Sequence, residues 1–136
     1  MTRPMIFADT SFWVAYRNRR DPHHEDAVSL IASHADGGLM TSNQVRGETW
    51  TYLRRRAGHR AAVGFLDALQ SSPRTTVELV DTATENEALD WLRRHDEREY
   101  SFVDATSFAV MRRRRVTEAL AFDGDFSAAG FVELRP

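Results

Sequence analysis

Two aspartates follow short apolar segments near the two ends of the chain. Asp9 comes directly after residues 4–8, and Asp123 directly after residues 116–122. Both segments are apolar enough to be buried strands that end at these acids. In open parallel α/β sheets, ligands bind outside the carboxyl ends of the strands. The two positions therefore favour a shared carboxylate site at one edge of a sheet over two unrelated polar turns.

Two further acids lie in expected helices, and each has two interpretations. Asp104 lies in the first turn of a nearly all-apolar helix, behind the expected N-cap Ser101, where the helix dipole favours a carboxylate even without a ligand. Glu48 lies beside the apolar stripe of another helix. It either pairs with Arg54 or Arg55 at the surface or faces a pocket at the edge of the sheet. Taken alone, each acid favours the structural interpretation, a capping residue for Asp104 and a surface residue for Glu48.

Together these acids suggest a metal site. Two like charges about 4 Å apart repel by about 4 kcal/mol at an effective dielectric constant of 20, so a carboxylate cluster needs a compensating cation. Oxygen-only ligands select Mg²⁺ or Mn²⁺. We expect Asp9, Asp104 and Asp123 to hold one or two such ions, and Glu48 to position a second ion or the attacking water. Asp125 is either a further ligand acting through water or only a turn residue.

The elements that position these acids alternate between strand and helix. This alternation predicts a parallel sheet with helices on both faces, a three-layer α/β/α architecture, in a single domain over residues 1–136. The expected strands lie at residues 4–8, 39–41, 75–80, 116–122 and 131–134. The expected helix starts are Thr10 or Ser11, Asp21, Ser42 or Asn43, Ala61, Thr82 or Thr84, and Ser101.

Composition excludes several mechanisms. All 18 basic residues are arginine, and the chain has neither lysine nor cysteine. The missing lysine excludes a phosphate-binding loop with its G-K-S/T signature and disfavours a phosphatase that works through an aspartyl-phosphate. The missing cysteine excludes disulfides and cysteine-bound zinc. No apolar run approaches the roughly 20 residues of a membrane-spanning helix, and the N-terminus lacks a signal peptide's long apolar region, so we expect a cytoplasmic protein.

Blocks of arginine create local positive patches within a net charge of −2. The planar guanidinium group binds two phosphate oxygens at once, so such patches suit phosphate groups, including those of a nucleic acid. The alternative is that each block is a solvated helix end, where cations are favourable. The first candidates for binding the phosphates of a nucleic acid follow elements that bear acids, and the block at 112–115 comes next. These candidates are Arg17, Arg19, Arg20, Arg46 and Arg112.

Four motifs around the acids carry a family resemblance. They are F-A-D-T-S around Asp9, N-Q-V-R-G-E ending at Glu48, S-F-V-D-A around Asp104 and A-F-D-G-D-F around Asp123. In this order, and over nearly the whole chain, they resemble the PIN domain, specifically the VapC-like toxin ribonucleases of type II toxin–antitoxin pairs. The resemblance implies a PIN-like fold and a metal-dependent endoribonuclease that leaves 5′-phosphate and 3′-hydroxyl ends. It also implies a cognate antitoxin protein that blocks the site, and a homodimer.

The acids and the resemblance together support one mechanism. A bound divalent ion lowers the pKa of the attacking water and neutralises charge on the leaving oxygen. We therefore expect hydrolysis of RNA without a 2′-hydroxyl nucleophile. The alternative is a catalytically silent module that keeps the fold and binds RNA or protein. RNA cleavage assays with Mg²⁺ or Mn²⁺ distinguish the two.

Overall fold

The computed structural model describes residues 4–136, and the strands of this part of the chain form a five-stranded parallel sheet in the order β3-β2-β1-β4-β5. The strands lie in the regions predicted from the sequence; β2 extends one residue further than predicted, to Ser42, and the other four are shorter than predicted. Their bounds are β1 Ile6–Ala8, β2 Leu39–Ser42, β3 Thr75–Glu78, β4 Glu118–Leu120 and β5 Val132–Glu133.

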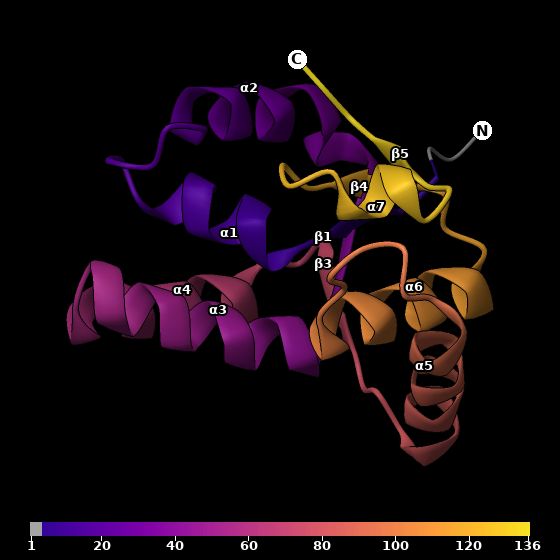
Figure 1. Cartoon of the computed structure of the whole chain (residues 1–136). Coiled ribbons are helices and arrows are strands. Elements are labelled where there is room, and N and C mark those ends of the chain that lie inside the picture. Colours follow the sequence, from indigo (N-terminus) through magenta and orange to yellow (C-terminus); the bar gives the residue numbers. More distant parts are fainter. Residues whose placement is uncertain (1–3) are drawn as a thin grey trace.

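Helices flank the sheet on both sides (Figure 1), which confirms the predicted architecture of a parallel sheet between helical layers. The two helices α3 and α4 lie side by side as a hairpin, and α5 packs against α6. The bounds are α1 Thr10–Arg17, α2 His24–His34, α3 Asn43–Arg56, α4 His59–Ser71, α5 Thr82–Arg94, α6 Phe102–Arg114 and α7 Asp125–Ala128, with a short 3₁₀ helix η1 at Ala35–Gly37.

The central strand β1 sets the register that brings the two strand-end aspartates together. It pairs with β4 through Phe7–Ala119 and Ala8–Leu120. Immediately beyond this pairing, the Asp9 N–H donates to the Leu120 carbonyl over 3.0 Å. Because the strands are parallel, the residues that follow β1 and β4 emerge at the same edge of the sheet.

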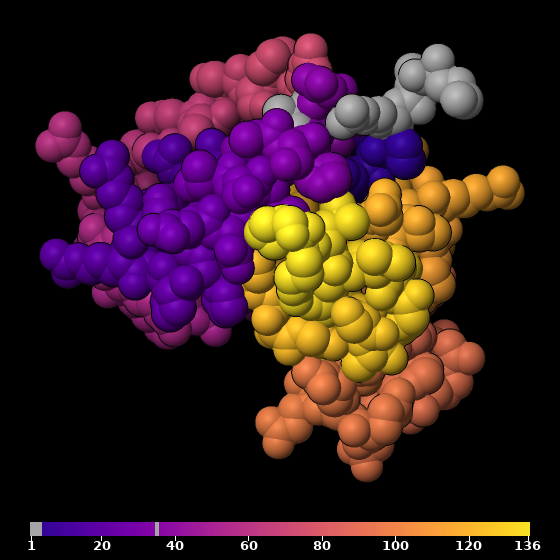
Figure 2. Space-filling model, turned by 90° about the horizontal axis from the view of Figure 1, so that it is seen from above, coloured from indigo at the N-terminus to yellow at the C-terminus, as the bar shows by residue number. Residues whose placement is uncertain are grey.

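The apolar helix α6 is buried along almost its whole length, as its sequence predicts. Every residue from Asp104 to Met111 is buried. Phe108 contacts the ring of Phe126 edge-on, with ring centroids 5.0 Å apart, and Phe126 stacks on Phe7 of β1. Figure 2 shows the C-terminal segment, in yellow, lying against both the N-terminal third of the chain and the segment beyond residue 100. This packing fixes α7, and with it the loop that carries Asp123.

Four predicted helix starts differ from the structure. Helix α1 is capped by Asp9, whose carboxylate accepts the Ser11 N–H, and not by Thr10 or Ser11. Helix α5 is capped by Asp81 instead of Thr82 or Thr84, and α4 begins at His59 and not at Ala61. Helix α2 begins at His24 and not at Asp21, because the Asp21 carboxylate accepts the His23 N–H and closes a turn before the helix. At α1, α2 and α5 the aspartate carboxylate thus accepts a backbone N–H close to the helix start.

Candidate active site

All four predicted acids line one pocket, called the acid pocket below, with a volume of about 550 Å³. Asp9 follows β1 and Asp123 follows β4, while Asp104 comes from the first turn of α6 and Glu48 from the second turn of α3. Helix α3 starts directly after β2, so it too begins at the carboxyl edge of the sheet. Four segments that are distant in sequence therefore meet at the edge where the sequence predicted a site.

Asp9 is buried at the centre of this edge, with 2% of its surface exposed. Its carboxylate accepts hydrogen bonds from the N–H and the hydroxyl of Ser11, and the same hydroxyl accepts the Phe122 N–H of the neighbouring loop. Burial, together with the negative charges of Asp123 and Asp104, raises the pKa of Asp9 to about 8, although the hydrogen bonds from Ser11 lower it. Near neutral pH the metal-free pocket therefore keeps a proton on Asp9.

Asp104 combines a capping position in α6 with a place in the lining of the acid pocket. It forms a capping box with Ser101: the Ser101 hydroxyl accepts the Asp104 N–H over 2.9 Å, and the Asp104 carboxylate accepts the Ser101 N–H over 3.0 Å. It also faces the acid pocket. Burial raises its pKa to about 7, with added repulsion from Asp125 and Asp123 and an opposing effect of the Ser101 N–H.

A tight turn after β4 presents Asp123 and Asp125 to the pocket. Gly124, at the turn, has a φ of +84°, a conformation that a residue with a side chain rarely adopts. The Arg98 guanidinium binds the turn from outside, donating to the Asp125 carboxylate over 2.8 Å and to the Asp123 carbonyl over 3.1 Å. The pKa of Asp123 is raised, mainly by burial and then by the charge of Asp125.

The donor atoms of this pocket suit a hard divalent cation. Asp104, Asp123 and Asp125 each offer a carboxylate oxygen, and these oxygens lie within 4.8 Å of one another. Asp9 adjoins this group and is coupled to it electrostatically. The buried hydroxyl of Thr10, which also lines the pocket, has no hydrogen-bond partner within the described part of the chain. Oxygen donors without nitrogen or sulfur select ions such as Mg²⁺ and Mn²⁺ over softer metals.

Glu48 faces the acid pocket, and within residues 4–136 it forms no ion pair with Arg54 or Arg55. The structure thus favours the second of its two predicted interpretations. Two residues on the same helix, Tyr52 and Arg56, also line the pocket and were not predicted. A spacing of four and eight residues from Glu48 places them on the same side of α3, and this spacing was the signal in the sequence.

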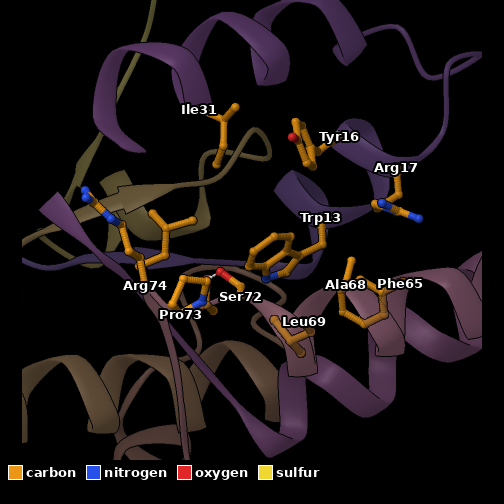
Figure 3. A pocket seen from close by; sticks show the side chains of 12 residues that line it. Trp13, Tyr16, Arg17, Ile31, Phe65, Ala68, Leu69, Ser72, Pro73 and Arg74 are labelled. Atoms are coloured by element: carbon orange, nitrogen blue, oxygen red, sulfur yellow. Dashed lines mark hydrogen bonds between the residues drawn. The ribbon is translucent and has the colours of Figure 1, made fainter. Parts of the chain in front are cut away.

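The five predicted RNA-binding arginines lie outside the lining of the acid pocket. Arg17 instead lines an apolar pocket of about 320 Å³ between α1, α2 and α4, where Trp13 faces Phe65 (Figure 3). Arg112 lies 3.6 Å from the carboxylate of Glu87. The side chains of Arg19 and Arg20 are exposed and that of Arg46 is half-buried. RNA binding by these five residues stays a prediction.

The fold and the acid pocket define a known class of protein. The chain belongs to the PIN domain family, which it matches over residues 6–132. In sequence it is similar to the 23S rRNA-specific endonuclease VapC20 of Mycobacterium tuberculosis strain H37Rv, with 60% identity over 132 residues that cover 97% of this chain and 99% of that protein. An identical match is found in strain CDC 1551 / Oshkosh.

A solved structure gives the same result. The crystal structure of Mycobacterium tuberculosis VapC20, described as a sarcin–ricin loop cleaving toxin, superimposes with a TM-score of 0.92 at 59% identity. The match covers 96% of this chain and 99% of that one. These likenesses confirm the predicted family, the predicted fold and the prediction of a toxin endonuclease. PIN nucleases use divalent metal ions, and VapC toxins bind RNA and an antitoxin.

Among the described residues 4–136, no helix is both long enough and apolar enough to cross a bilayer.

Proposed function

We propose that this chain is a divalent-metal-dependent endoribonuclease, the toxin of a type II toxin–antitoxin pair, and that it cuts 23S rRNA in the sarcin–ricin loop. The observation that carries this proposal is the convergence of acids from β1, α3, α6 and the loop after β4 in one pocket. The choice of substrate rests on the 60% identity to VapC20, whose name specifies 23S rRNA.

The proposed cofactor is Mg²⁺ or Mn²⁺, held by Asp9, Asp104 and Asp123. These acids fit a divalent ion because burial and mutual repulsion raise the pKa of each one, so a cation that neutralises them removes an electrostatic cost. When bound, such an ion lowers the pKa of water and neutralises charge on the leaving oxygen of the scissile phosphate. We infer that Asp125, held by Arg98, supports the ion site through Asp123 or through water.

The protein's own side chains would orient and deprotonate the attacking water. Glu48 lines the same pocket from a separate helix, and its carboxylate is the group that we assign to orient the attacking water and accept its proton. Water attack on phosphorus needs no 2′-hydroxyl of the RNA. The products are therefore a 5′-phosphate and a 3′-hydroxyl.

The test is cleavage of a synthetic RNA stem-loop with the sequence of the 23S sarcin–ricin loop. Purified protein should cut it once in Mg²⁺ or Mn²⁺ and not in EDTA, and end-group analysis should find 5′-phosphate and 3′-hydroxyl ends. A 2′,3′-cyclic phosphate would contradict the mechanism. A silent RNA-binding module would bind the RNA with and without Asp9→Asn and cut in neither case, which would overturn the proposal. Cleavage of other RNAs but not this loop would overturn the substrate alone.

The proposed partners follow from the same assignment. A cognate antitoxin protein should co-purify with the chain when the two are expressed together and should abolish cleavage. We also propose a homodimer of single-domain chains, residues 1–136, which light scattering after size-exclusion chromatography measures directly. Because ribosomal RNA is the proposed substrate, the proposed site of action is the cytoplasm.

A further inference from the structure

The acid pocket has an unbalanced charge that its proposed substrate must overcome. Seven acids line it, whereas Arg56 is the one arginine in the lining that residues 4–136 provide. An RNA strand brings further negative charge to this pocket, and cationic side chains are the usual partners of its phosphates. The acids are Asp9, Asp21, Glu48, Glu99, Asp104, Asp123 and Asp125.

Arg56 belongs to a row of side chains that leads away from the acids along α3. Glu48, Tyr52 and Arg56 are spaced four residues apart, and each step of four residues advances about 6 Å along a helix on the same side. All three also line an adjoining hollow of about 360 Å³, together with Thr51 and Arg55. Because the two hollows share these three residues, they lie next to each other along this side of α3.

Tyr52 is exposed in a way that is unusual for a large aromatic side chain. About 42% of its surface is open to solvent, and it lines the acid pocket. The Arg56 guanidinium carbon lies 5.1 Å from the centre of the Tyr52 ring, within the range of a cation–π contact. An exposed aromatic ring next to an arginine is a common platform for unpaired bases, since the ring stacks on a base and the arginine binds the backbone.

We propose that Tyr52 stacks on an unpaired RNA base one or two nucleotides from the scissile phosphate, and that Arg56 binds a phosphate next to that base. This inference rests on the proposed endoribonuclease function and names the part of the pocket that positions its substrate. The competing explanation is that Tyr52 and Arg56 only form a pair four residues apart that stabilises the exposed side of α3.

The decisive experiment uses the sarcin–ricin stem-loop with a single abasic nucleotide moved through each position near the cut. With wild-type protein, one abasic position should raise KM about 5- to 150-fold, the loss expected when one base no longer stacks on an aromatic ring. Tyr52→Ala should cause a similar loss on intact RNA. On RNA that is abasic at that one position, Tyr52→Ala should raise KM no more than about twofold above the wild-type value. The reason is that the stacking contact between the base and the ring is already absent from this RNA.

Conservative variants separate the ring from its hydroxyl and from helix stability. Tyr52→Phe keeps the stacking surface and should keep the wild-type KM and the wild-type response to the abasic series. Thermal unfolding of Tyr52→Ala checks that the fold is intact. If each abasic substitution raises KM by the same factor in wild type and in Tyr52→Ala, Tyr52 does not stack on an RNA base. The assignment of the chain as a nuclease would be unaffected by that result.

Arg56 has a matched control on the same helix. Arg54 belongs to the same arginine block but lies outside the linings of the acid pocket and the adjoining hollow. Arg56→Gln should weaken RNA binding and reduce the slope of log affinity against log salt by about 0.7, the value for one lost phosphate contact on a single strand. Arg54→Gln should leave the slope unchanged. Equal slopes in both variants would overturn the phosphate contact.

Discussion

The C-terminal end of α6 and the carboxyl edge of the sheet use charged residues in opposite ways. At the end of α6, the arginines are paired: Arg113 lies 2.8 Å from Glu87, and Arg114 lies 3.0 Å from Glu78. At the carboxyl edge, the pKa values of Asp9 and Asp104 are raised by burial and by other acids. Charges with partners hold helices in place. Acids crowded against one another store an electrostatic cost that only protons or a cation can remove, and this marks the functional edge.

The largest effect should follow from removing a carboxylate at the carboxyl edge. Asp9→Asn keeps the shape of the side chain but removes its negative charge, so the metal site loses a ligand. We expect cleavage of the sarcin–ricin stem-loop to fall at least about 100-fold, because electrostatic stabilisation by a bound metal is worth several kcal/mol. Single-turnover assays measure the rate. Near-wild-type cleavage by this variant would remove Asp9 from the active site.

The next effect concerns pH. Protons on Asp9 and Asp104, whose pKa values are about 8 and about 7, compete with the cation. Affinity for Mn²⁺ should therefore rise between pH 6 and pH 8, by up to about tenfold per pH unit for each proton released. Isothermal titration calorimetry in buffers of different ionisation enthalpy measures both the affinity and the number of protons. A pH-independent affinity without proton release would contradict the raised pKa values.

A smaller effect should appear in the stability of the metal-free protein. The pKa of Asp9 is about 8 in the folded chain and 3.8 as its ordinary value. Between these values the folded state binds more protons than the unfolded state, so the free energy of unfolding should fall as pH rises from about 4 to about 8. Asp9→Asn should therefore be more stable than wild type at pH 9 in EDTA, by at least about 1 kcal/mol, the equivalent of about one pKa unit.

Denaturant unfolding of both proteins at pH 5 and pH 9 measures this difference. Excess Mn²⁺ provides the control, because binding of the cation to the folded wild type should reverse the order of stability at pH 9. If Asp9→Asn is the less stable protein at pH 9 in EDTA, the carboxylate stabilises the fold and the account of its burial is wrong.

The smallest effect should come from the end of α6. Glu87→Gln removes the negative partner of Arg112 and Arg113, which are half-exposed in this contact. Exposed ion pairs contribute little, so we expect a loss of less than about 1 kcal/mol in unfolding free energy and an unchanged cleavage rate. The cleavage and unfolding assays described above measure both quantities. A strong loss of cleavage would mean that the end of α6 and the carboxyl edge do not divide their roles as described.

The acids were predictable because their positions depend on local features of the sequence. A short apolar strand that ends in an aspartate places that residue at the carboxyl edge of a parallel sheet, and a capped apolar helix fixes Asp104 in its first turn. Thr10 and Ser11 were preferred to Asp9 as the cap of α1 because both residue types cap helices well, whereas the structure gives this role to Asp9.

The arginines were harder to place from sequence. Whether a cation at a helix end faces solvent, a glutamate or a pocket depends on which element packs beside it. Arg112 reaches Glu87 because α5 lies against α6, and no local pattern fixes that contact. Arg56 was not singled out from the sequence because it belongs to a block of consecutive arginines. Its spacing of eight residues from Glu48 on one helix was nevertheless a signal that it lies near the acids.

The most direct test of the central claim is anomalous scattering from a crystal of the protein grown with Mn²⁺. The account predicts a manganese peak in the acid pocket, within coordination distance of carboxylate oxygens of Asp9, Asp104 and Asp123. A pocket without a peak at millimolar Mn²⁺, or a peak bound only elsewhere on the protein, would contradict it.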